Sequence, residues 1–315
     1  MSSTSATLNP AASFEPYRRR LLGLAYRMLG SMADAEDAVQ ETYLRWHGAD
    51  RDRVLDPRAF LMPTTTRICL DMLTSARARH EEYVGPWLPE PVLDTAALAP
   101  DTRTELAEDL SIALLLTLDR LSPLERAAFL LHDVFDFSFT EVATTLERSE
   151  PACRKLATRA RAHVCALRPR GATAPPVRSD GIDTKHAQLM SAFAAATQSG
   201  DLNALTLLLA SDVRVVTDGG GKVRAALKVV EGADEAAKFL VGVAARKRPD
   251  AWWRDDFRPR FAIINGLPGI IVEGSEGAVQ TAAFEIEGGV IRALYVVRNP
   301  EKLRHLAVRH ESGPE

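Results

Sequence analysis

The residues best suited to chemistry lie on one face of a helix predicted to follow Ser149. Residues 151–170 contain six lysines and arginines and neither aspartate nor glutamate. Helical spacing divides this segment into two faces. The apolar face comprises Cys153, Leu156, Ala157, Ala160, Val164 and Leu167. The opposite face comprises Arg154, Lys155, Thr158, Arg159 and Arg161. Cationic and hydroxyl side chains presented together suit contacts with the phosphates and base edges of DNA.

A shorter predicted helix, residues 140–146, precedes the cationic one across a tight turn. Ser149 is expected to cap the second helix, with Pro151 in its first turn, where proline is tolerated. Two helices joined in this way, the second basic and outward-facing, are typical of a helix-turn-helix that enters the major groove. A turn glycine is missing, because Glu147 and Arg148 stand there. A solvated surface helix is the alternative interpretation of the charge run.

A second cationic group ends an earlier predicted helix. Arg77, Arg79 and His80 precede two aromatic residues, Tyr83 and Trp87. Cations attract phosphates, and flat aromatic faces accept unstacked bases. This stretch is therefore a second candidate for contact with nucleic acid.

The bulk composition is that of a globular protein whose positive charge is local. Hydrophobic residues make up 46% and charged residues 26% of 315, with a net charge of −3. The three cysteines, Cys69, Cys153 and Cys165, lack metal-type spacing, so no metal is expected. We expect no other cofactor. Few cysteines and no signal-peptide or membrane-span pattern lead us to expect a soluble cytoplasmic protein without a membrane partner.

Two proline-rich stretches, residues 84–100 and 168–181, divide the chain into three blocks. The first two blocks have helical periodicity. Pro63 is expected to kink or interrupt the helix 57–79, since proline lacks an amide proton. Ser122, Pro123 and Glu125 predict a helix start with a capping box.

The third block begins with helices and continues with strands, as in an α+β domain. We expect its strands to be antiparallel and separated by glycine-containing turns. The predicted strands are VRVVT, VRAALKVV, RPRFAIING, GIIVEG, GAVQTAAFEIEG and VIRALYVVRN, with a helix in EGADEAAKFLVGVAARK.

The stretch TDGGGKV, residues 217–223, raises the possibility of a phosphate-binding loop. Such a loop needs a following helix and a Ser or Thr after its lysine. Val223 follows Lys222, and the next residues favour a strand. We therefore expect a hairpin turn in which Gly219, Gly220 and Gly221 supply positive φ angles. The loop is then either a plain turn or a surface that contacts another part of the chain.

The order of these motifs resembles a known family. ADAEDAVQETYLRW, DPRAFLMPTTTRICLDML and LSPLERAAFLLHDVFDFSFTEVATTLERSEPACRKLATRAR are similar to extracytoplasmic-function (ECF) RNA polymerase sigma factors over residues 13–168. The additional motifs GPWLPEP, DGGGK and NPEKL resemble the sigma-J-like subgroup, which carries a C-terminal SnoaL-like domain. With these motifs the resemblance extends over nearly the whole chain.

The resemblance implies a multidomain fold. Two all-α sigma domains, a region 2 helical bundle and a region 4 helix-turn-helix, precede an α+β SnoaL-like (NTF2-like) cone domain. The expected boundaries are region 2 at 13–83, a linker at 84–101, region 4 at 102–168, a second linker at 169–182 and the SnoaL-like domain at 183–310.

The resemblance also implies partners and residue roles. Core RNA polymerase would be bound through Asp37, Gln40 and Glu41. The −10 promoter element would be contacted by Arg77, Arg79 and His80. The −35 element would be contacted by Arg154, Lys155, Thr158, Arg159 and Arg161. The SnoaL-like domain would act as a built-in regulator that contacts the sigma domains or the linker through Asp218, Gly219, Gly220, Gly221 and Lys222. In the linker, Trp87 would be the apolar anchor that the domain holds.

An alternative is a sigma-like DNA-binding protein whose SnoaL-like domain binds or converts a small molecule. A catalytic pocket of this fold needs a buried carboxylate or histidine. The candidates are His186, Asp212, Asp218, Trp252, Trp253, Asp255 and Glu285, and their spacing forms no recognisable pair. We therefore expect no enzymatic activity. A helix-turn-helix repressor is less compatible with the sequence, because it would not need the DAEDAVQETYLRW block.

Overall fold

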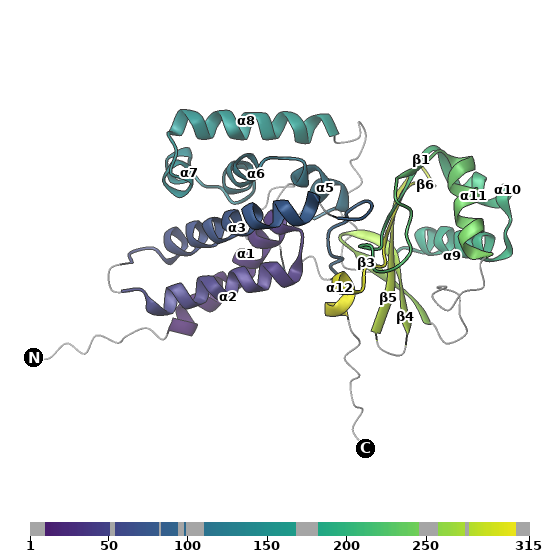
Figure 1. Ribbon diagram of the computed structural model, residues 1–315, viewed down its shortest axis with the longest axis horizontal. Coiled ribbons are helices and arrows are strands. Elements are labelled where there is room, and N and C mark those ends of the chain that lie inside the picture. The colour runs from purple at the N-terminus through teal and green to yellow at the C-terminus, as the bar shows by residue number, and fades with distance from the viewer. Residues whose placement is uncertain are drawn as a thin grey trace, which may run out of the picture. The chain divides into compact units, whose positions relative to one another are not determined.

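The computed structural model describes eight stretches of the chain (Figure 1). They are residues 10–50, 54–81, 83–93, 98, 110–167, 182–245, 258–274 and 277–306, without the side chains of 75–81, 167 and 258. The chain divides into two compact units. The first comprises Met1–Glu81 and Thr95–Pro169, and the second comprises Glu82–Asp94 and Arg170–Glu315.

The described part of the first unit is helical. Its elements are α1 (Pro10–Leu29), α2 (Met32–Gly48), α3 (Pro57–Glu81), α5 (Ile112–Asp119), α6 (Pro123–Phe129), a π-helical segment (Leu130–Val134), α7 (Phe139–Leu146) and α8 (Glu150–Leu167). Gly30 has a φ of 69° and ends α1, and Ser31 then caps α2 by accepting a hydrogen bond from the amide of Asp34. Trp46 of α2 is buried against Phe60 of α3, with ring centroids 5.5 Å apart.

The expected interruption at Pro63 does not occur, because α3 runs from Pro57 to Glu81 through that proline. Leu61 and Met62 on one side of Pro63 are fully buried, and so are Thr65 and Thr66 on the other. Packing on both sides of Pro63 therefore offsets the lost backbone hydrogen bond.

The predicted capping box at the start of α6 is confirmed. Ser122 accepts a hydrogen bond from the amide of Glu125, whose carboxylate accepts one from the amide of Ser122 in return. The hydroxyl of Ser122 also donates to that carboxylate at 2.6 Å, which holds the pKa of Glu125 below its ordinary value.

Replacing Ser122 by alanine is expected to destabilise the first unit by about 1 kcal/mol, the usual loss for an N-cap. Because the pKa of Glu125 is lowered on folding, its contribution is present above the unfolded pKa and is lost as the pH falls through the folded one. The difference in unfolding temperature between Ser122→Ala and the parent protein should therefore be smaller at pH 3 than at pH 7. An equal difference at both pH values would contradict this account.

The second unit combines helices with one six-stranded sheet. Its helices are α9 (Thr184–Ser199), α10 (Leu202–Leu208), α11 (Ala233–Ala244) and α12 (Pro300–Leu303), followed by a 3₁₀ turn (Arg304–Leu306). Its strands are β1 (Leu209–Asp218), β2 (Val230–Glu231), β3 (Arg258–Ile264), β4 (Leu267–Gly274), β5 (Gly277–Glu287) and β6 (Val290–Val297). The strand order is β2-β1-β6-β5-β4-β3.

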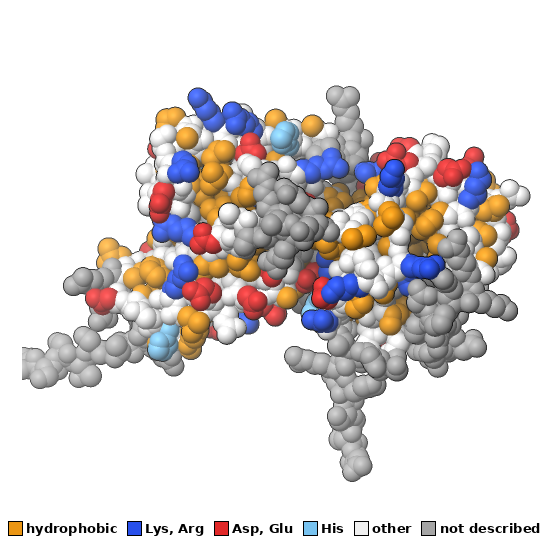
Figure 2. All heavy atoms as spheres, in the orientation of Figure 1, with side chains coloured by type: hydrophobic (Ala, Val, Ile, Leu, Met, Phe, Trp, Pro, Cys, Tyr) orange, Lys and Arg blue, Asp and Glu red, His pale blue; other side chains and the backbone are white. Residues whose placement is uncertain are grey.

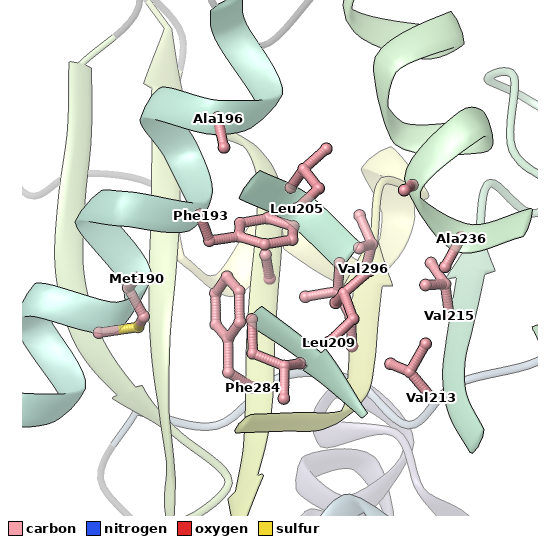
Figure 3. Packing of buried hydrophobic residues seen from close by; sticks show 14 of the residues in the cluster. Met190, Phe193, Ala196, Leu205, Leu209, Val213, Val215, Ala236, Phe284 and Val296 are labelled. Carbon is pink, nitrogen blue, oxygen red and sulfur yellow. The ribbon is translucent and has the colours of Figure 1, made fainter. Parts of the chain in front are cut away.

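The core of this unit lies between the sheet and helices α9, α10 and α11 (Figure 3). Phe193 of α9 meets Phe284 of β5 edge to face, with ring centroids 5.3 Å apart. Aromatic pairs favour this geometry, and the two rings bury large apolar surfaces together. The fold is therefore α+β, as expected.

Two expectations about the sheet are wrong. First, the strands are not all antiparallel, because β1 pairs with β6 in parallel. Second, VRAALKVV is not a strand, because only Val230 and Glu231 join the sheet. The amide of Ala226 instead donates to the hydroxyl of Thr217 at 2.7 Å, so the stretch after the glycines is a loop fixed by a side chain. TDGGGKV is consequently not a hairpin turn.

No helix in the part of the chain that the structure describes combines the length and the apolar character needed to cross a bilayer.

Candidate nucleic-acid interface and linker clasp

Helix α8 exposes the cationic face that the sequence predicts. Arg154, Lys155, Thr158 and Arg159 are exposed, while Arg161 is half-buried. On the opposite side, the buried residues are Cys153, Ala157, Ala160 and Val164. Figure 2 shows blue lysine and arginine side chains along the outer edge of this helix. The helix is therefore held by its apolar side and leaves its cations accessible.

The turn before α8 explains how the motif manages without glycine. Glu147 has φ 54° and ψ 48°, the left-handed conformation that glycine usually supplies. Its amide donates to the carbonyl of Ala143, and the amide of Arg148 donates to the same carbonyl at 3.1 Å. These two bonds end α7 as a glycine C-cap would, so the turn remains tight.

Two of the α8 arginines are paired with carboxylates. Arg154 donates to Glu150, which also accepts from the hydroxyl of Thr140, and these bonds lower the pKa of Glu150. Arg161 donates to Asp133 at 2.7 Å. These pairs orient the two guanidinium groups before any ligand is present.

Two arginines of α3 donate to carbonyls at the ends of helices in the second helical block. Arg58 donates to the carbonyl of Phe135 at 2.8 Å, just after the π-helical segment. Arg67 donates to the carbonyls of Thr144 and Thr145 at the end of α7, both at 3.1 Å. Helix C-termini carry partial negative charge, which cations stabilise. The two helical blocks are thereby joined within the first unit.

The α2 residues expected to bind a partner lie on its outer side. Asp37 and Gln40 are exposed, and Glu41 is half-buried and pairs with Arg45 at 3.0 Å. The sequence analysis missed Leu44 on the same side, whose side chain is 57% exposed. Its spacing from Gln40 and Asp37, four and seven residues, is the signal that could have found it.

The backbone of Arg77, Arg79 and His80 belongs to α3. Their side chains lie outside the described residues, so their predicted role is not tested.

A second site lies in the second unit, where residues 83–93 are held against the sheet domain. We call it the linker clasp, formed by Asp218, Asn265, Asn299, Lys302 and His305 around that segment. Leu88, Pro89, Glu90, Pro91 and Val92 of the segment are buried. The segment contains the WLPEP motif.

Asp218, at the end of β1, is the centre of the clasp and is fully buried. One carboxylate oxygen accepts from the hydroxyl of Tyr83 at 2.5 Å and from the amide of Gly220 at 3.0 Å. The other accepts from the amide of Leu88 at 2.8 Å and from the ammonium of Lys302 at 2.7 Å. Four donors thus satisfy the buried charge.

Lys302, in α12, binds the linker directly as well. Its ammonium donates to the carbonyl of Leu88 at 2.5 Å. It lies 4.4 Å from the ring centroid of Trp87 and 4.9 Å from that of Tyr83. Cations are attracted to aromatic faces at such distances, most strongly in a desolvated site. The parallel pairing of β1 with β6 places α12 beside Asp218, because the carbonyl of Asp218 accepts from the amide of Asn299 at 3.1 Å.

Further bonds fix the two ends of the segment. Val92 donates its amide to the side chain of Asn265 at 3.1 Å and accepts from the amide of Asn265 at 2.8 Å. A ring nitrogen of His305 lies 2.7 Å from the carbonyl of Pro91. At the other end, Asn299 donates to the hydroxyl of Tyr83 at 3.0 Å. The linker therefore has side-chain partners at Tyr83, at Trp87 and Leu88, and at Pro91 and Val92.

The glycines of DGGGK let the backbone approach these partners closely. Gly220 and Gly221 have φ of 59° and 70°, as expected for positive-φ turn residues. Gly219 lacks a positive φ, which the sequence analysis expected for all three. A Cβ at Gly220 would overlap the Asn299 amide, and one at Gly221 would press on Val84. Lys222 lies at the rim, paired with Glu301.

Burial and the hydrogen bond to Asp218 raise the pKa of Tyr83, so its hydroxyl stays protonated and continues to donate. Sequence reasoning missed Tyr83, Asn265, Asn299, Lys302 and His305 as members of the clasp. The motif NPEKL contains Asn299 and Lys302, so the sequence analysis identified this stretch but assigned no role to these two residues.

The candidate catalytic residues of the second unit have other partners where they are described. Asp218 belongs to the clasp. Asp212 pairs with Arg292 at 3.0 Å, and Glu285 accepts from the hydroxyl of Tyr295 at 3.0 Å. His186 lies 3.1 Å from Asp183 at the start of α9. Trp252, Trp253 and Asp255 lie outside the described residues. Within the described ranges, no cluster of three His, Cys, Asp or Glu side chains could hold a metal ion.

Comparisons with known proteins agree with this organisation. The family Sigma-70 region 2 matches residues 14–79, and the family Sigma-70, region 4 matches residues 111–164. The chain is 38% identical over 299 residues to the ECF RNA polymerase sigma factor SigJ of Mycobacterium tuberculosis, covering 92% of each chain. It is 28% identical over 166 residues to the ferric citrate uptake sigma factor FecI of Escherichia coli, covering 52% of this chain and 94% of FecI.

A solved structure is similar over nearly the whole length. The crystal structure of the extracytoplasmic function sigma factor SigJ of Mycobacterium tuberculosis has a TM-score of 0.67 and 34% sequence identity, covering 93% of this chain and 97% of that one. The similarity therefore includes the α+β unit and the linker as well as the helical blocks.

Proposed function

This chain belongs to the ECF family of RNA polymerase sigma factors, and we propose that its SnoaL-like domain regulates promoter-directed transcription through the linker clasp. As a sigma factor it directs core RNA polymerase to promoters. The SnoaL-like domain holds residues 83–93, which begin two residues after the last residue of α3. This arrangement makes a separate anti-sigma protein unnecessary.

The residue roles form part of the proposal. Arg154, Lys155, Thr158, Arg159 and Arg161 contact the −35 element, and the exposure of the α8 cationic face supports this role. Asp37, Gln40 and Glu41 on the outer side of α2 bind core polymerase. Arg77, Arg79 and His80 at the end of α3 contact the −10 element.

The observation that carries the regulatory role is the buried pair of Asp218 and Lys302, closed over the linker. Besides their bond to each other and the bond from the amide of Gly220 to Asp218, these side chains contact linker atoms, namely the hydroxyl of Tyr83 and the amide and carbonyl of Leu88. A buried charge needs such partners to offset its desolvation. The linker therefore completes the folded SnoaL-like domain, and the domain in turn restricts the linker.

Restricting the linker matters because it joins the two DNA-binding domains. Within the first unit, Arg58 and Arg67 join the two helical blocks directly. Contact with −10 and −35 elements that are well separated on the promoter requires these blocks to part. Such a rearrangement needs freedom in the connecting segment, which the clasp controls.

The DNA-binding assignment is tested by Arg154→Ala and Arg159→Ala. Each variant is expected to weaken promoter binding by about 1–3 kcal/mol if its side chain contacts a base. Fluorescence anisotropy with promoter DNA and with scrambled DNA measures the effect, with Lys238→Ala on α11 as a control. An equal loss on both DNAs would mean that the side chain touches only phosphate. Unchanged binding in both variants would refute the assignment.

The regulatory assignment is tested by run-off transcription with purified core polymerase. The full-length protein is compared with a variant whose clasp is broken at Asp218. Equal transcript yields at matched sigma concentration would refute regulation through the clasp.

A further inference from the structure

The loop that follows the DGGGK glycines carries cations without acids. Residues 219–229 contain Lys222, Arg224 and Lys228 and neither aspartate nor glutamate. Arg224 and Lys228 are exposed. The linker also lies close to the middle of this loop, since a Cβ at Gly85 would be 3.6 Å from the carbonyl of Ala226. None of the hydrogen bonds described for the clasp comes from the side chain of Arg224 or Lys228.

Arg224 and Lys228 differ from most cations of the same unit in having no carboxylate partner among the described residues. Elsewhere on its surface, Lys238 pairs with Glu235 at 2.8 Å and Arg260 pairs with Glu273 at 3.0 Å. Arg292 and Lys222 also have carboxylate partners. These two cations in one loop can therefore pair with an external anion without breaking an internal ion pair to a carboxylate of the described residues.

The loop is ordered by bonds that leave both cations at the surface. Between the two, the amide of Ala226 donates to the hydroxyl of Thr217 at 2.7 Å. Arg298, after β6, donates to the carbonyl of Arg224 at 2.7 Å, which brings a third cation to the loop. A surface fixed in this way loses little conformational entropy when it binds. We call Arg224 and Lys228 the loop cations.

We propose that the loop cations bind the phosphate backbone of promoter DNA, as a third DNA contact of this sigma factor. The proposal rests on the promoter-binding function proposed above. Neighbouring cations that lack internal counterions gain free energy when they displace counterions from DNA. The contact is independent of sequence, because it reaches phosphates and not base edges.

Chain connectivity favours DNA as the partner. A single residue separates the end of α3 at Glu81 from Tyr83, which is bound to Asp218 at the start of the loop. When the end of α3 is on the −10 DNA, this short tether keeps the loop at a high effective concentration near the same duplex. An acidic surface on the polymerase is the competing partner, which the experiment distinguishes.

The test compares the full-length double variant Arg224→Gln, Lys228→Gln with the parent protein, each assembled with core polymerase. Promoter affinity is measured by fluorescence anisotropy at a series of KCl concentrations. Removal of two phosphate contacts is expected to reduce the slope of log K against log[salt] by about 1–2, at about 0.9 for each contact. Scrambled DNA should show the same reduction. The exposed glutamines should leave the thermal unfolding unchanged.

The matched control is Lys238→Gln, Arg260→Gln, which also removes two positive charges from this unit. An unchanged slope in the loop variant would overturn the proposal, and so would an equal reduction in the control. A loss of affinity for core polymerase with an unchanged DNA slope would assign the loop to the polymerase instead. Arg154→Ala serves as a reference, because its failure to weaken specific binding would count against the proposed −35 contact and not against the loop.

Discussion

Replacement of Asp218 by alanine is expected to release the linker and to destabilise the second unit by about 3–5 kcal/mol, the usual loss when one partner of a buried ion pair is removed. The ammonium of Lys302 would remain in a site where its side chain is only 9% exposed. The hydroxyl of Tyr83 and the amide of Leu88 would lose their acceptor. Calorimetry measures the destabilisation, and amide hydrogen exchange at Leu88 and Val92 measures the release of the linker.

Lys222→Ala is the matched control for this prediction. It breaks the rim pair with Glu301, whose side chains are 48% and 49% exposed. Exposed pairs contribute about 0–1 kcal/mol. If amide exchange at Leu88 is faster in Asp218→Ala but not in Lys222→Ala, the buried pair of Asp218 and Lys302 is what holds the linker. Equal exchange rates in Asp218→Ala and the parent protein would show that other bonds hold the linker.

Deletion of the chain after Asp180 is expected to change promoter-directed transcription by about 5- to 150-fold, the range of a coupling free energy of about 1–3 kcal/mol. The truncated protein keeps both regions that match sigma factor families. The sigma factor FecI is matched over 94% of its own length by 52% of this chain. The deletion removes every clasp residue contributed by the sheet domain.

A separate binding assay distinguishes loss of regulation from loss of folding in the truncated protein. The truncated protein should still bind core polymerase, as measured by competition with labelled full-length protein. Intact binding together with altered transcription supports regulation by the SnoaL-like domain. Intact binding with unchanged transcription would contradict it.

Local features of the sequence predicted much of the molecule. The two faces of α8 and the capping box of α6 depend on residues within one or two turns of each other, so periodicity and capping chemistry sufficed. The later strands were found for the same reason. The lack of a glycine in the turn before α8 did not mean that the turn was altered, because Glu147 adopts the left-handed conformation itself.

Features that depend on distant residues could not be predicted from local patterns. The parallel pairing of β1 with β6 joins segments about eighty residues apart, and this pairing brings Lys302 to Asp218. The partners of the linker are separated from it by more than a hundred residues, as for Leu88 and Asp218. The local pattern also favoured a strand after Lys222, where the Thr217 hydroxyl fixes a loop. Sequence motifs identified DGGGK, WLPEP and NPEKL without revealing that they form a single site.

Run-off transcription from one promoter, with core polymerase and three sigma proteins, tests most directly whether the linker clasp governs this factor. The proteins are the full-length chain, the Asp218→Ala variant and the chain ending at Asp180. If the SnoaL-like domain acts by holding the linker, the variant and the truncated protein should shift transcript yield in the same direction and by similar factors. A large shift on truncation, with the Asp218→Ala variant indistinguishable from the full-length protein, would contradict the account.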